Sequence, residues 1–230
     1  MSVSVAEKLF TIYGVVGERL NALLEMTKGA RSRGWLRGFR GVVPHWFEDL
    51  VLLERDASSM QEVATRVVPG ILQTEDYARA VLQGGIVGLD VDSLVQARLA
   101  RAEVLDRPLP PEYWVVLCES VLQCQIGGRD VMGLQLDHLV EQAQRPNITM
   151  QVLPNSHGAH PSMNNPFTIL GFDLAPDFSV VYMDYLTGSL YRDDPDEVAQ
   201  YHRAYRHIIK AALPEDQSIE IIKVRMKELS

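Results

Sequence analysis

The chain has 230 residues, of which 47% are hydrophobic and 23% are charged, and its formal net charge is −8. This acidic balance argues against direct binding of nucleic acid, because such binding needs clustered Lys and Arg to neutralise phosphates. The two cysteines, Cys118 and Cys124, give neither a disulfide framework nor a zinc-ligand spacing, and they are expected to be reduced, buried thiols. The sequence shows no secretory leader and no membrane-spanning run, so it predicts a soluble cytoplasmic protein without a membrane partner.

The N-terminal quarter of the chain predicts helices. Apolar residues recur at helical spacing over residues 6–28, although Gly14 and Gly17 weaken the middle of that helix. A stretch of glycines and aromatic residues follows, and a short helix is expected over residues 44–57, with Pro44 in its first turn.

The next segment contains a strand pattern followed by a helix pattern. The stretch EVATRVV, residues 62–68, is rich in β-branched residues and ends at Pro69-Gly70, so it predicts a strand. Thr74 is expected to cap a helix that starts with Glu75 and Asp76. A further helix is predicted from Asp92 to about Leu105. Pro69-Gly70 is therefore a corner between a strand and a helix.

Strands dominate the second half. YWVVLCESVLQCQI, residues 113–126, predicts a strand or hairpin arm that Gly127-Gly128 closes, and residues 129–144 form an amphipathic helix. Three more strands are expected at 148–154, 167–172 and 178–186. Two helices end the chain, one capped by Asp194 with Pro195 in its first position and one over 215–229.

This order of elements indicates an α+β fold, with a mixed or largely antiparallel sheet flanked by helices. We expect residues 1–58 to form a helical N-terminal segment that packs on the main domain. Residues 59–230 are expected to form the α+β domain itself.

Signatures of common enzymes are absent from the sequence, which contains no G-x-S-x-G, Walker-type, H-E-x-x-H or G-x-G-x-x-G motif. The long polar loop at residues 154–167 is a candidate ligand-binding segment, because long loops on a rigid scaffold often carry function. The acidic residues Glu119 and Asp184 lie in predicted strands, where a carboxylate is either solvated or buried with a partner. No metal site and no cofactor are expected. The candidate ligand-binding residues are His157, His160, Asn164, Asn165, Tyr185 and Gln73.

Several blocks of the sequence occur together in one known family. They include VVPGILQTEDYARAVL at residues 67–82, ARLARAEVL at residues 97–105 and VVYMDYLTGSLY at residues 180–191. In these blocks the chain resembles, from about Ile12 to Leu229, the C-terminal domain of actinobacterial Xre-family regulators of the Scr type, which are antitoxin-like transcriptional regulators. Such proteins normally begin with a helix-turn-helix domain, for which the first eleven residues are too few. The resemblance therefore implies regulation without direct DNA binding by this chain.

Three hypotheses follow. The first is a regulatory sensor or partner-binding domain, expected to form a homodimer, that binds a small molecule or a small cognate protein. The second is a stand-alone enzyme of small-molecule, natural-product biosynthesis or group transfer, with Glu119, His160 and Asp184 as catalytic candidates. The third is a dimerisation module that has no pocket.

Overall fold

The computed structural model describes residues 3–17, 20–21, 23–24, 45–85, 90–173, 175–186 and 188–229. Within these residues lies one six-stranded sheet in the order β3-β2-β1-β4-β5-β6. β1, β2 and β3 run parallel, whereas β4, β5 and β6 join by antiparallel pairing. The strands are β1 (Ser59–Ala64), β2 (Glu112–Cys118), β3 (Ile148–Leu153), β4 (Phe167–Gly171), β5 (Ser179–Tyr185) and β6 (Gly188–Arg192).

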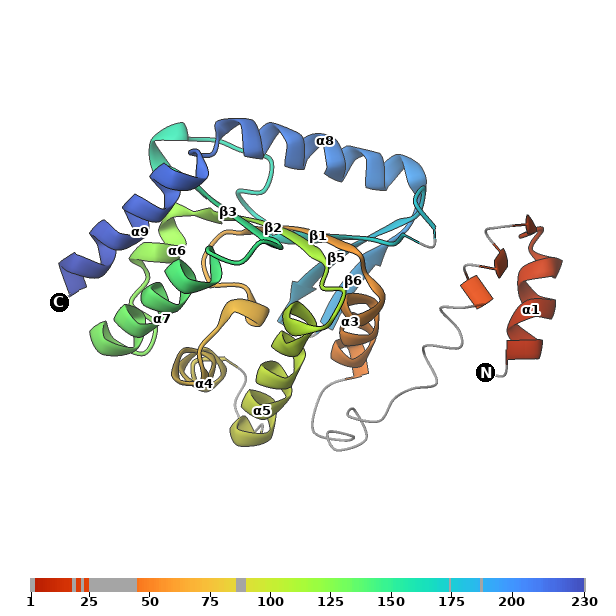
Figure 1. The fold of residues 1–230 in the computed structure, drawn as a ribbon, viewed down its shortest axis with the longest axis horizontal. Helices are drawn as coiled ribbons and strands as arrows, with labels where there is room; N and C mark the ends of the chain where they lie inside the picture. Colours follow the sequence, from red (N-terminus) through yellow and green to blue (C-terminus); the bar gives the residue numbers. More distant parts are fainter. Residues whose placement is uncertain are drawn as a thin grey trace.

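Helices cover both faces of this mixed sheet, so the predicted α+β class is confirmed. In Figure 1, α8 lies across the upper face, and α3, α4, α5 and α7 lie below it, with α9 beside α7 and β3. No helix among the described residues is long and apolar enough to cross a membrane. The helices are α1 (Val3–Ile12), α3 (His45–Asp56), α4 (Glu75–Gln83), α5 (Val91–Ala102), α6 (Glu119–Gln123), α7 (Arg129–Gln142), α8 (Pro195–Ala211) and α9 (Glu215–Leu229).

The path of the chain explains why the sheet is mixed. Parallel neighbours need a crossover connection, and the β1–β2 crossover consists of the 3-10 turn η2 (Gly70–Leu72), α4, α5 and η3 (Glu103–Asp106). The β2–β3 crossover consists of α6 and α7. After β3 the chain passes to the other side of β1 and returns as β4. The sheet therefore changes direction between β1 and β4, where α/β sheets commonly place a ligand crevice.

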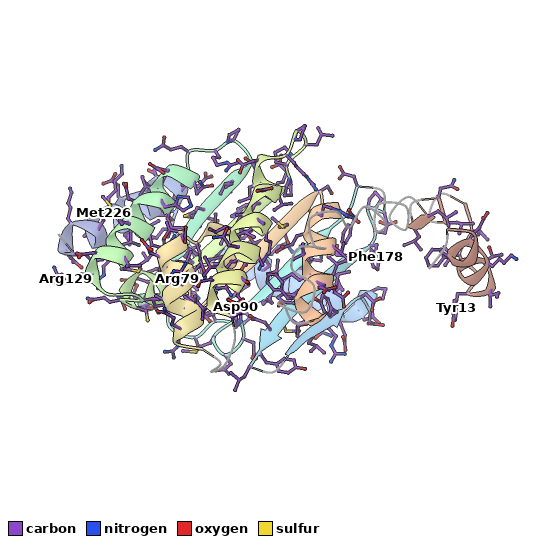
Figure 2. All side chains as sticks on the ribbon, turned by 90° about the horizontal axis from the view of Figure 1, so that it is seen from below. Tyr13, Arg79, Asp90, Arg129, Phe178 and Met226 are labelled. Atoms are coloured by element: carbon purple, nitrogen blue, oxygen red, sulfur yellow. The ribbon has the colours of Figure 1, made fainter. Side chains whose placement is uncertain are left out.

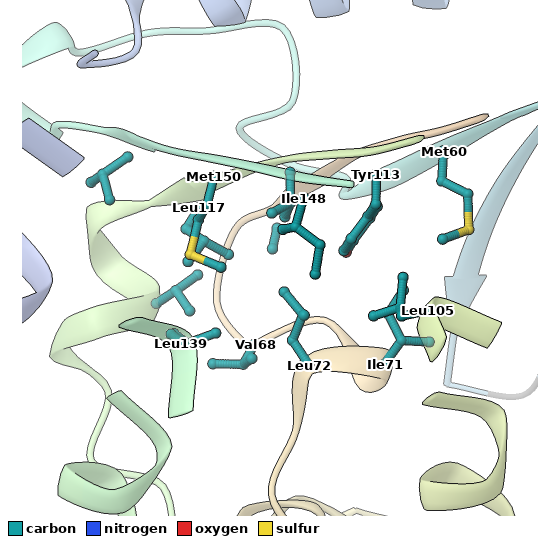
Figure 3. Packing of buried hydrophobic residues seen from close by; sticks show 14 of the residues in the cluster. Met60, Val68, Ile71, Leu72, Leu105, Tyr113, Leu117, Leu139, Ile148 and Met150 are labelled. Carbon is teal, nitrogen blue, oxygen red and sulfur yellow. The ribbon is translucent and has the colours of Figure 1, made fainter. Parts of the chain in front are cut away.

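The larger apolar core lies on the lower face of the sheet. Figure 3 shows Ile71 and Leu72 of η2 facing the side chains of β1, β2 and β3, among them Met60 and Tyr113. A second cluster lies under α8, where Val63 and Ile169 of the sheet meet Ile208. Alternate residues of β1 thus enter different cores, as the two-residue period of a strand requires.

The outer edge of β3 is closed by the connection between α8 and α9. The N–H of Val152 donates to Oγ of Ser218 at 2.8 Å, and the N–H of Leu213 donates to the Val152 carbonyl at 2.9 Å. At the far end of α9, Arg129 of α7 donates to the carbonyls of Glu228 and Leu229 (Figure 2). Side chains and loop backbone therefore take up hydrogen-bonding groups that a sheet edge and a helix end would otherwise leave open.

Two predictions about strands are wrong. β1 covers Ser59–Ala64 instead of 62–68, because the chain leaves the sheet at Thr65 despite its β-branched residues. The predicted strand at 113–126 ends at Cys118, and Glu119–Gln123 is the helix α6. Consequently Glu119 does not lie in a strand, and Cys124 is exposed instead of buried. The sequence analysis also missed β6.

The predicted helices agree more closely with the structure. α3, α5, α7, α8 and α9 all lie where they were expected, and the Asp194 carboxylate caps α8 by accepting from the N–H groups of Asp196 and Glu197. The first predicted helix is interrupted, since α1 ends at Ile12 and Gly14 has a φ of 75°, whereas the described residues at 17, 20–21 and 23–24 are again helical. α5 is capped by Asp90. Pro44 lies outside the described residues.

The division at residue 58 does not separate α3 from the sheet. Leu50 and Ala57 are buried in the same core as β1 and β2, so α3 belongs structurally to the α+β domain. This helix is a fixed part of the domain that the sequence analysis had assigned to residues 59–230.

A buried glutamine joins α7 to the corner after β1. Thr74 occupies the N-cap position of α4, but its hydroxyl donates to Oε1 of Gln135 instead of capping the helix. Gln135 also accepts from the Thr74 N–H at 2.8 Å and donates to the Leu72 carbonyl at 2.7 Å. One side chain thus satisfies three polar groups of the corner.

We expect Gln135→Ala to lower the free energy of unfolding by about 2–3 kcal/mol, because it leaves buried polar groups of the corner without partners. Urea unfolding measures the loss. Gln125→Ala, at an exposed glutamine, is the matched control and is expected to change stability by less than about 0.5 kcal/mol. Equal effects of the two changes would show that Gln135 does not hold the corner.

Candidate functional site

A cavity of about 290 Å³ lies between the sheet and the helices α3 and α5, at the end of β1 and the start of β4. Its floor is a row of side chains across three strands, since Glu62 pairs in register with Thr168 and Thr168 pairs with Tyr182. Ala64, at the end of β1, and residues 65–70, which follow it, form one wall, and Arg98 and Arg101 of α5 form another. The cavity is therefore rich in charged and hydroxyl-bearing groups.

Arg101 and Glu54 form a buried ion pair beside this cavity. Nε and Nη2 of Arg101 donate to the two carboxylate oxygens of Glu54 at 2.5 and 2.8 Å, and the two side chains are 11% and 3% exposed. The guanidinium also lies over the ring of Phe47, at 5.5 Å from its centroid. Burial alone would lower the pKa of Arg101, but the charge and hydrogen bonds of Glu54 raise it above the ordinary value. The pair thus links α3 to α5 through two hydrogen bonds.

Glu62 is the titratable group on the floor of the cavity. Burial raises the pKa of its carboxyl from 4.5 to about 7, although the hydrogen bond from Tyr113 and the charge of Arg101 act in the opposite direction. The Tyr113 hydroxyl donates to Oε2 of Glu62 at 2.6 Å. Glu62 is therefore the group in the cavity that gains or loses a proton near neutral pH.

Arg98 is held in place by a glutamine of the corner. Nη1 of Arg98 donates to Oε1 of Gln73 at 2.9 Å, and Nε2 of Gln73 donates to the Val68 carbonyl at 2.7 Å. Burial, together with the nearby charge of Arg101, lowers the pKa of Arg98 to about 10, so the guanidinium stays protonated at neutral pH. Across the described residues, Arg98 forms no ion pair with a carboxylate.

The Pro69-Gly70 corner is a wall of the cavity. A side chain at Gly70 would start 3.1 Å from Nη1 of Arg101, so glycine at this position leaves room for the guanidinium. The N–H of Val68 donates to the hydroxyl of Tyr77, which fixes the chain just before the turn. The corner offers no nucleophile, in agreement with its interpretation from sequence as a structural element.

Some residues predicted as site residues do line this region. Gln73 and Asp184 both face the cavity. Asn165 and Tyr185 line a neighbouring hollow beside β5, to which Asp184 also contributes. Asn164 is exposed and lines neither of these two hollows. Asp184 is thus the predicted carboxylate that the structure places at a cavity.

The other candidates lie elsewhere. Glu119 accepts a hydrogen bond from the Asn155 N–H at 2.8 Å, and the ring of His157 lies 6.3 Å from that of His207. Nε2 of His160 is 3.8 Å from Sγ of Cys118. The structure therefore does not bring Glu119, His160 and Asp184 into one acid–base site.

His160 and Cys118 do not form an activated thiol pair. Burial raises the pKa of the Cys118 thiol to about 11, so that the nucleophilic thiolate is scarce at neutral pH. Burial also lowers the pKa of His160. Among the described residues, no cluster of three His, Cys, Asp or Glu side chains could hold a metal ion.

Four charged residues of the site were missed from the sequence: Glu54, Glu62, Arg98 and Arg101. One available signal was Glu62, a carboxylate in the predicted strand at residues 62–68, for which the argument applied to Asp184 holds equally. Another was the i, i+3 spacing of Arg98 and Arg101, which places both on one side of a helix.

A family model with the description Domain of unknown function (DUF5753) matches residues 47–224, which include every residue that lines the cavity. The chain belongs to the DUF5753 family. No curated protein and no solved structure matches it. In this DUF5753 chain, the matched region begins inside α3, so the helix that carries Glu54 is part of the family's domain.

We expect Glu54→Leu to lower the free energy of unfolding by about 3–5 kcal/mol, because it leaves the Arg101 charge buried without its partner. Adding Arg101→Met should restore most of this stability, since an apolar pair of similar size replaces the ion pair. Urea unfolding of both single variants and the double variant gives the coupling. A double variant no more stable than Glu54→Leu would contradict the assignment.

The raised pKa of Glu62 predicts a pH dependence of stability. Between pH 4.5 and about 7 the folded chain keeps a proton on Glu62 that the unfolded chain has released, so this group lowers the free energy of unfolding as the pH rises through that range. Glu62→Gln removes the effect. The variant's stability relative to the wild type is therefore expected to increase by about 1–3 kcal/mol across this range, as measured by urea unfolding. A difference that is constant with pH would contradict the assignment.

Proposed function

We propose that this chain is the sensor domain of an antitoxin-like regulator and that it binds a small molecule in the cavity between α3, α5 and the sheet. The observation that carries the proposal is Arg98, a protonated guanidinium that faces the cavity and has a glutamine instead of a carboxylate as its partner. Taking a charge out of water is costly unless an opposite charge compensates it. A bound ligand would supply that compensation.

The walls of the cavity support a sensing role. Phe47 and Leu50 of α3 line the cavity, and the same helix is linked to α5 by Glu54. α3 also leads back along the chain to the N-terminal segment, next to which the resembling regulators carry their DNA-binding domain. A ligand that favours one position of α3 would change what the N-terminal segment presents, provided its affinity differs between the two positions.

Glu62 favours a second candidate function, which is enzymatic. A carboxyl group whose pKa is about 7 is suited to general acid–base catalysis, and Glu62 lies on the floor of the cavity. In this alternative the cavity would convert its ligand instead of only retaining it. Glu62 would then replace Glu119 and His160 as the catalytic candidate.

Native mass spectrometry of the purified chain, compared with its denatured mass, tests the proposal. We expect a retained small molecule or, after screening of a metabolite library, a ligand that raises the melting temperature. Arg98→Met should remove that response, whereas Arg203→Met on the exposed side of α8 should preserve it. Hydrogen exchange should show added protection in α3 when the ligand is bound.

Each outcome separates the candidates. A ligand recovered with its mass unchanged and accompanied by protection of α3 supports the sensor. A ligand recovered as a product, with conversion lost in Glu62→Gln, supports the enzyme. A chain that retains no molecule and responds to no metabolite refutes both and directs attention to a protein partner.

A further inference from the structure

We propose that the cavity binds a small zwitterion of the amino-acid type, with its carboxylate on Arg98 and its ammonium group between Asp184 and Glu62. The inference rests on the proposed function, since it names the class of ligand for the same cavity. It depends on two opposite charges that face one space without pairing with each other.

Arg98 provides the anion-binding end. One of its N–H groups donates to Gln73, and no other hydrogen bond from this guanidinium to a described group is formed. Arg98 lines the cavity, and a guanidinium matches a carboxylate through paired N–H···O bonds. Arg101 is less suited to this role, because its Nε and Nη2 already donate to both carboxylate oxygens of Glu54, which compensates its charge.

Asp184 and Glu62 provide the opposite end. Both line the cavity, and in the described chain Asp184 makes no ion pair with Arg98 or with any other cation. On Glu62, Oε2 accepts from Tyr113, whereas Oε1 has no bond with a described group. Two acceptor groups thus lie in the same cavity as a fixed cation, and a ligand with both charges would satisfy both ends.

The size of the cavity limits the ligand. At about 290 Å³ it lies at the lower end of the range of about 300–1,000 Å³ that is usual for ligand sites. Apolar side chains of Leu50, Val68 and Val81 complete the lining and can contact an aliphatic part. A polyanion such as a nucleotide fits poorly, because Asp184 and Glu62 would repel its phosphates. Placing like charges next to each other in a binding site lowers the affinity.

Isothermal titration calorimetry and thermal shift with the full chain test the inference. The probes are the proteinogenic amino acids, each compared with the amine that lacks its carboxylate and the acid that lacks its ammonium group. We expect at least one amino acid to bind and raise the melting temperature, and its two truncated analogues to bind at least roughly tenfold more weakly.

Variants assign the two ends of the ligand. Arg98→Met is expected to weaken binding of that amino acid roughly 30-fold or more, and Arg98→Lys, which keeps the charge but lacks the fork, is the second variant in case the first does not fold. Asp184→Asn, at the exposed end, is expected to weaken binding about fivefold. Asp137→Asn on the exposed surface of α7 is the control for the lost charge.

Several outcomes would overturn the inference. If the chain retains or responds to another molecule but to no amino acid, the zwitterion is wrong and the sensor cavity stands. A phosphate-bearing ligand that needs Arg98 and the exposed Arg66 at the rim, but not Asp184, leads to the same conclusion. If no small molecule of any class binds, the inference and the proposed function fail together.

Discussion

The ion pair between Arg101 and Glu54 is the constraint on which the candidate site depends. It fixes α5 against α3 beside the sheet residues that form the floor of the cavity. A space therefore remains between the two helices and the sheet. Replacing both groups with apolar residues would stabilise many proteins equally well, and a buried pair is therefore weak evidence of selection for stability alone. What the pair contributes here is placement: Glu54 compensates the charge of Arg101, whereas Arg98, one helical turn earlier, lines the cavity with a glutamine as its hydrogen-bond partner.

The floor of the cavity also depends on contacts between different elements of the fold. Glu62 is distant in sequence from Thr168 and Tyr182, and the three become neighbours only through the pairing of β4 with both β1 and β5. Position and charge are coupled in this row, because the pKa of Glu62 responds to burial, to Tyr113 and to the two charges of the ion pair. A change at Tyr113 or at either member of the ion pair therefore alters the pKa of Glu62.

Local sequence patterns predicted the elements that depend on local physics. The amphipathic period of α7, the cap of α8 and the apolar runs of β3, β4 and β5 were sufficient, since propensity and burial agree there. Residues 65–68 were predicted wrongly because their β-branched side chains favour a strand, whereas the chain turns away to build the wall of the cavity. Glu119 was predicted wrongly because a helix of only five residues leaves too little periodicity to detect.

The residues of the candidate site are brought together only by tertiary contacts. Polarity was enough to name Gln73 and Asp184 as candidate site residues. No local pattern, however, shows that strand pairing places Asp184 and Glu62 at the same cavity, or that α3 lies against α5.

The closed edge of β3 has a consequence for synthesis of the chain. The groups that satisfy Val152 come from Leu213 and Ser218, more than sixty residues later by sequence number, so β3 can pair with β2 well before its outer edge is covered. During that interval a growing polypeptide presents an open strand edge, the kind of surface that recruits other chains. The connection after α8 and the start of α9 therefore protect this strand edge as well as completing the two cores, and the edge stays open until the end of the chain has been made.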